Sequence, residues 1–79
     1  MQETMVFSMD NEEERIIREK LQVVYNALEA KGYNPINQIV GYLLTEDPTY
    51  ITTNGNARSI MLSMDRDDLL MVLVRKFLS

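Results

Sequence analysis

The chain has 79 residues, 46% of them hydrophobic and 25% charged, so it has room for one small domain. Twelve acidic residues against eight basic ones give a formal charge of −4, which lacks the basic surface that nucleic-acid binding requires. With no Cys and no His, the sequence excludes disulfides, thiolate nucleophiles, imidazole acid–base catalysis and zinc sites built from those ligands.

Hydropathy and size bear on location and assembly. No run approaches the roughly 18 apolar residues of a membrane span, and residues 1–10 lack the layout of a secretory signal. We therefore expect a cytoplasmic protein with no membrane insertion.

A chain this short buries only about 60–65% of its unfolded surface. Without disulfides or a metal to reinforce so small a core, we expect a homodimer.

The N-terminal third contains the clearest helical pattern. Residues 1–10 precede that pattern and are predicted to form a flexible tail. A helix is predicted from Asn11 to Lys31, with Asn11 as N-cap and Glu12–Glu14 complementing the positive end of the helix dipole. Its apolar positions recur at helical spacing. They are Ile17, Leu21, Val24 and Leu28.

A second helix is predicted from Pro35 to about Thr45, with Asn34 as its N-cap and Pro35 at its first position. Gly41 lies inside this helix, where glycine is unfavourable by about 1 kcal/mol relative to alanine. Such a glycine often marks the close approach of another backbone. We therefore predict that Gly41 faces a partner subunit.

The C-terminal part is predicted to contain two more helices. Residues 52–55 have the composition of an exposed turn, and a third helix is predicted from 56 to 64. Asp65 is predicted to cap a fourth helix that is apolar nearly all round, which indicates a subunit interface. The predicted interface residues are Gly41, Leu70, Leu73, Val74 and Phe77. In total, we expect a compact all-α domain of four to five helices over residues 11–79.

The sequence offers no arrangement of residues suited to catalysis or metal binding. Its two acidic groups, Glu12–Glu14 and Asp65/Asp67/Asp68, lie where helix N-termini favour negative charge, and neither has the spacing of a calcium loop. There is no phosphate-binding loop, Rossmann fingerprint or nucleophile elbow. We therefore predict no catalytic residues, no bound metal and no cofactor. The alternative is a helix-turn-helix nucleic-acid binder. The sequence disfavours it, because the third predicted helix has a single basic residue, Arg58.

The sequence also resembles a known family. Residues 31–44 read K-G-Y-N-P-I-N-Q-I-V-G-Y-L-L and are followed by D-P-T-Y-I. Residues 3–7 read E-T-M-V-F, and V-V-Y-N-A-L-E precedes the long run. This combination resembles the signature of the IreB regulatory phosphoproteins, and the likeness covers nearly the whole chain.

The resemblance implies an all-α homodimer with a flexible N-terminal tail that a transmembrane Ser/Thr kinase phosphorylates. It further implies a negative regulator of intrinsic cephalosporin resistance, with a cognate phosphatase and a downstream protein as partners, and with no catalytic activity. Thr4 matches the family's phosphothreonine. A second threonine found in some members corresponds to Met1 here.

The chain departs from the family pattern after Ile51. Relatives usually have proline and basic residues there, whereas this chain has T-T-N-G-N at 52–56. Ser8, Thr52 and Thr53 are further hydroxyl residues that a kinase could modify. The alternative to a phosphorylation switch is a constitutive dimeric adaptor, which variants at Thr4 would distinguish.

Overall fold

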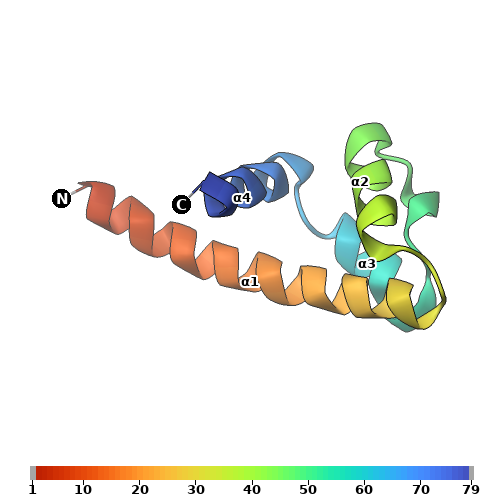
Figure 1. Ribbon diagram of the computed structural model, residues 1–79. Helices are drawn as coiled ribbons and strands as arrows, with labels where there is room; N and C mark the ends of the chain where they lie inside the picture. The colour runs from red at the N-terminus through yellow and green to blue at the C-terminus, as the bar shows by residue number, and fades with distance from the viewer. Residues whose placement is uncertain (1, 79) are drawn as a thin grey trace.

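The computed structural model describes the backbone of residues 2–78 and the side chains of residues 12–78, and it confirms an all-α fold (Figure 1). Over these residues the chain forms helices and turns and no strand. The elements are α1 (Gln2–Ala30), α2 (Pro35–Thr45), the 3-10 turns η1 (Pro48–Tyr50) and η2 (Asn54–Asn56), α3 (Ala57–Leu62) and α4 (Arg66–Leu78).

Helix α1 begins earlier than predicted. It starts at Gln2, so Asn11 lies inside the helix and is not its N-cap. Residues 2–10 contain neither glycine nor proline, the residues that most strongly interrupt a helix, so nothing in their sequence ends it there. Residues 1–10 lie outside the part of the chain whose side chains are described, so the predicted flexibility of this tail stays a prediction. The other end is as expected, because Gly32 adopts a φ of +85° just past the helix.

The later helix ends follow local side-chain chemistry. The Asn34 side chain accepts a hydrogen bond from the Asn37 N–H at 3.1 Å, which confirms the predicted cap of α2. The Asp65 side chain accepts one from the Asp67 N–H at 2.9 Å at the start of α4. Helix α3 is shorter than predicted, since Asn56 has a left-handed φ of +61° and Ser63 donates its hydroxyl to the Ile60 carbonyl.

The hydrophobic core gathers residues from every helix. The stripe predicted on α1 is confirmed, with Leu21 partly buried and its other members buried. Buried residues of the later elements include Ile51, Met61 and Leu69, which are all but inaccessible to solvent. The buried core consists of Ile17, Val24, Ala27, Leu28, Tyr42, Leu43, Ile51, Ala57, Met61, Met64, Leu69 and Val72.

Helix α4 is attached through polar contacts at both of its ends. At its start, Arg66 Nη1 donates to the Leu43 carbonyl at 2.7 Å, and Arg66 Nε lies 2.9 Å from a carboxylate oxygen of Glu46. Near its end, Lys76 Nζ lies 2.8 Å from Glu14 Oε2 of α1. Helix α4 therefore runs from the C-terminal end of α2 back toward the N-terminal half of α1 (Figure 1).

Candidate functional site

The predicted site residues fall in different places in the structure. Thr4 lies outside the residues whose side chains are described. Of the five predicted interface residues, Gly41 lies on α2 and the other four lie on α4. The four on α4 all keep more than a third of their surface exposed, and Phe77 is 87% exposed. We call Leu70, Leu73, Val74 and Phe77 the outer face of α4.

Gly41 is covered by a residue of its own chain. A Cβ atom at this position would lie 2.5–2.9 Å from three atoms of the Tyr50 ring, closer than packed carbon atoms approach. The Gln38 side chain donates to the Tyr50 carbonyl at 2.9 Å and fixes this segment against α2. The sequence prediction attributed the glycine to the approach of another backbone. The structure gives a side chain, that of Tyr50, as the close neighbour, and a role of Gly41 in a dimer stays a prediction.

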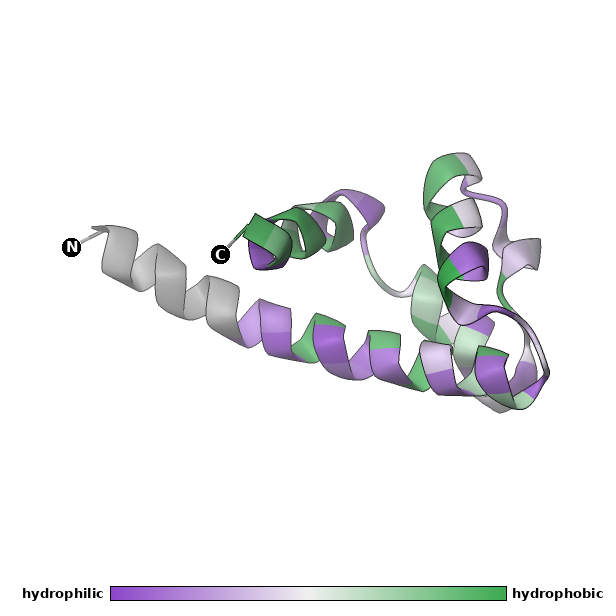
Figure 2. Cartoon of the chain, viewed as in Figure 1, coloured by the Kyte–Doolittle hydropathy of each residue, from purple (hydrophilic) through white to green (hydrophobic). Residues whose placement is uncertain are grey.

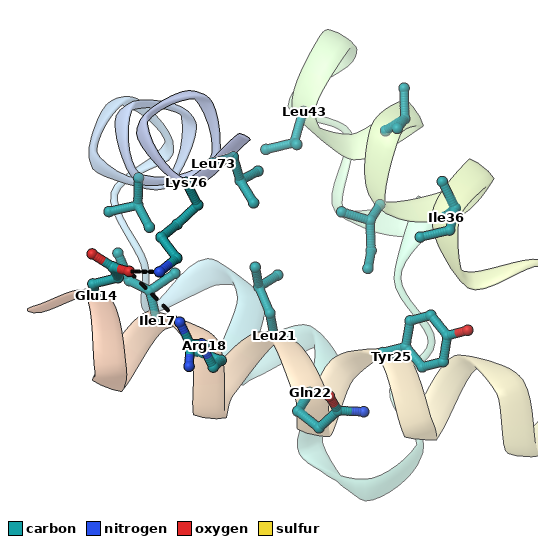
Figure 3. Close-up of a pocket in the computed structure, with 13 residues that line it drawn as sticks. Glu14, Ile17, Arg18, Leu21, Gln22, Tyr25, Ile36, Leu43, Leu73 and Lys76 are labelled. Carbon is teal, nitrogen blue, oxygen red and sulfur yellow. Dashed lines mark ion pairs between the residues drawn. The ribbon is translucent and has the colours of Figure 1, made fainter. Parts of the chain in front are cut away.

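An apolar groove lies between α1, α2 and α4 (Figure 3). Its volume of about 500 Å³ is within the range of known binding sites. Helix α4 contributes Leu73 to one wall, and α2 contributes Val40 opposite. The full lining is Glu14, Ile17, Arg18, Leu21, Gln22, Tyr25, Ile36, Ile39, Val40, Leu43, Val72, Leu73 and Lys76.

Charged side chains cluster at one end of this groove. Glu14 is only 13% exposed and lies between Lys76, at 2.8 Å, and Arg18, at 3.6 Å. The hydrogen bond from Lys76, reinforced by the positive charges of Lys76 and Arg18, lowers the pKa of the Glu14 carboxyl below its ordinary value. The carboxylate therefore stays ionised at neutral pH and connects α4 to α1.

The sequence assigned Glu14 a different role. It was predicted to sit in the first turn of α1, but α1 begins at Gln2, so the side chain is remote from the helix end. Its partner Lys76 is distant in sequence, and no local pattern relates the two residues.

Helix α2 carries an apolar stripe that the sequence does indicate, since Ile36, Val40 and Leu44 recur every four residues. All three prove to be exposed. We call them the α2 stripe.

Three further observations concern the described residues. Within residues 12–78, no three His, Cys, Asp or Glu side chains come together in a way that could hold a metal ion. Asp65 acts as the cap of α4, as predicted. Among the helices that the structure describes, none is long and apolar enough to cross a membrane.

Among the described residues, uncovered apolar surface is thus found on a helix face and in the groove beside it. Figure 2 shows hydrophobic colouring along most of α4. Contiguous apolar surface of this kind typically marks a site where another protein binds. The fold therefore defines a small all-α protein with an uncovered apolar helix face and a groove beside it.

Comparison with known proteins identifies the family. The family described as IreB regulatory phosphoprotein matches residues 2–79, and the chain belongs to it. A "UPF0297 protein" of Ruminiclostridium cellulolyticum is 54% identical over 76 residues, which cover 96% of this chain and 86% of the relative. Another of the same name, from Acetivibrio thermocellus, is 53% identical over 76 residues, with 96% and 84% covered. The predicted family resemblance is confirmed.

Proposed function

We propose that this protein is a non-enzymatic regulatory phosphoprotein of the cytoplasm, phosphorylated on Thr4 by a transmembrane Ser/Thr kinase. In this proposal it acts as a negative regulator in a cell-envelope stress pathway that controls cephalosporin resistance. The observation that carries the proposal is the family match over residues 2–79, together with the E-T-M-V-F segment that contains Thr4.

Phosphorylation of Thr4 would act through charge. A phosphate adds about −1.5 to −2 charges and three strong hydrogen-bond acceptors. The chain already carries a formal charge of −4, so the added charge repels acidic surface and attracts arginine-rich surface. The modified segment therefore either leaves the acidic body of its own protein or becomes an epitope for a basic site on a partner.

We further propose that the protein works as a homodimer and signals through a downstream protein, with the kinase and its phosphatase as transient partners. The uncovered outer face of α4 supports this, because a small chain with no disulfide gains stability by burying such surface against a second chain. The proposal includes no cofactor, nucleic acid or membrane insertion.

The experiment compares Thr4→Ala and Thr4→Glu with the wild type in the native cells, with Ser59→Ala, an exposed hydroxyl residue of α3, as the control. Phosphosites are mapped by mass spectrometry during cell-wall antibiotic stress, and cephalosporin resistance is scored in parallel. We expect phosphate on Thr4 and different resistance for the two Thr4 variants. An unmodified Thr4 with an active kinase, or identical behaviour of all variants, would instead support a constitutive adaptor.

A further inference from the structure

A second groove, with a volume of about 460 Å³, lies between α1 and the start of α4, and its walls are acidic. Two exposed carboxylates line it from α1 and two from the start of α4. They are Glu12, Glu13, Asp65 and Asp68. The one cationic side chain in the described lining is that of Lys20, which donates to the Ser63 hydroxyl at 3.0 Å. Four negative charges against one positive charge leave a formal charge of −3, and we call this groove the acidic groove.

The carboxylates of the acidic groove differ in how far their charge is neutralised. Glu12 lies 2.6 Å from Arg15, so its charge is compensated within α1. Glu13 and Asp68 form no ion pair with any residue whose side chain the structure describes. These two side chains, one on each wall, therefore carry uncompensated negative charge into the groove.

Stabilisation of a helix end accounts for the acidic residues of α4 but not for Glu13. Asp65 caps α4 and Asp68 lies in its first turn, where the helix dipole favours negative charge. Glu13 lies well inside α1, which begins at Gln2, and the effect of the dipole falls off within the first turn. Its carboxylate thus has no structural role among the described contacts and is available to a ligand.

The floor of the acidic groove is apolar. Ile16 is 40% exposed on α1, and the core residues Ile17 and Met64 also line the groove. A site for a metal ion needs several oxygen ligands around one point, and within residues 12–78 no three acidic side chains converge in that way. An apolar floor between two acidic walls is instead complementary to a peptide that carries an apolar side chain between basic ones.

We propose that the acidic groove binds a basic segment of a partner protein, in which one apolar residue is flanked on both sides by arginine or lysine. The apolar side chain covers Ile16, and the flanking cations pair with Glu13 on one wall and with Asp68 on the other. Charge complementarity identifies the partner, because only a basic segment neutralises both walls. The site does not depend on phosphorylation of Thr4, so this proposal and the proposed function fail or succeed separately.

Binding is measured by fluorescence anisotropy with a dye-labelled synthetic peptide in which two arginines flank a central leucine on each side. One control peptide has glutamine in place of every arginine, and another has serine in place of the leucine. The groove variant of the protein is Glu13→Gln/Asp68→Asn. Its matched control, Glu29→Gln/Asp67→Asn, removes two charges from the same two helices at exposed positions outside the lining.

A second pair of variants tests the floor of the acidic groove. Ile16→Ser is compared with Val23→Ser, because Val23 is 44% exposed on the same helix but does not line the groove. Circular dichroism verifies that every variant keeps the helix content of the wild type. All four variants change exposed side chains, so the comparison is made on folded protein.

We expect saturable binding of the arginine–leucine peptide that weakens as the salt concentration rises, and clearly weaker binding of both control peptides. The groove variant should bind at least about fivefold more weakly than the wild type, since it loses two partly exposed ion pairs, and its matched control should stay within about twofold. Ile16→Ser should bind at least about twofold more weakly than Val23→Ser, because it loses apolar contact area.

Three results would overturn the proposal. The first is no saturable binding up to about 1 mM peptide. The second is an equal loss in the groove variant and its matched control, which would show that the peptide responds to the net charge of the protein alone. The third is wild-type binding by Ile16→Ser, which would show that the floor of the groove takes no part.

Discussion

Replacing Gly41 by alanine tests the contact between α2 and Tyr50. In an isolated helix the change is favourable by about 0.8–1 kcal/mol, since alanine has the higher helix propensity. In this structure the new methyl group would lie 2.5–2.9 Å from the Tyr50 ring, and the ring must move. Overpacking of this kind costs about 1–3 kcal/mol. We therefore expect Gly41→Ala to lower the free energy of unfolding, by up to about 2 kcal/mol.

The decisive assay repeats the substitution in a Tyr50→Ala background. Urea unfolding is followed by circular dichroism at one fixed protein concentration, because the proposed dimerisation would make apparent stability concentration-dependent. Without the ring, Gly41→Ala should become stabilising, by about 1 kcal/mol, so its effect changes sign. If alanine stabilises both backgrounds equally, Tyr50 does not cover Gly41. If it destabilises both equally, another group, such as a partner subunit, contacts Gly41.

Two further predictions concern the ion pair and the core. Glu14→Gln should loosen the attachment of α4 to α1. Because the pKa of Glu14 is lowered in the folded protein, its carboxylate stabilises the fold at any pH above the ordinary glutamate pKa of about 4.3. This contribution is lost as the pH falls through the lowered pKa. Unfolding at about pH 7 and about pH 3 should thus differ less in Glu14→Gln than in the exposed control Glu13→Gln, and equal pH dependence would refute the pair's role. Met61→Ala should destabilise by about 2–5 kcal/mol, since Met61 is fully buried. The neighbouring residue Leu62 is half-exposed, so Leu62→Ala should lower the free energy of unfolding clearly less. Similar losses for the two variants in urea melts would contradict the assigned packing.

The sequence by itself determined most of the secondary structure, because caps and helical periodicity act over a few residues. Asn34 and Asp65 cap their helices through side-chain oxygens that reach the backbone two or three residues on. The apolar spacing on α1 likewise predicted which of its residues enter the core. The start of α1 was predicted incorrectly. Asn11 and the acidic run after it resemble a helix N-terminus, yet nothing before them interrupts the helix.

Only the tertiary structure decided which of these residues meet. Glu14 resembles a helix-end charge in sequence, but its partner is Lys76, brought beside it by the return of α4 along α1. Gly41 is predictable as a position of close approach, but the sequence could not show that the Tyr50 ring occupies it. Packing between distant segments depends on how whole helices are placed, a long-range outcome that local propensity and spacing do not contain. For the same reason the groove, built from three helices, is a property of the folded chain alone.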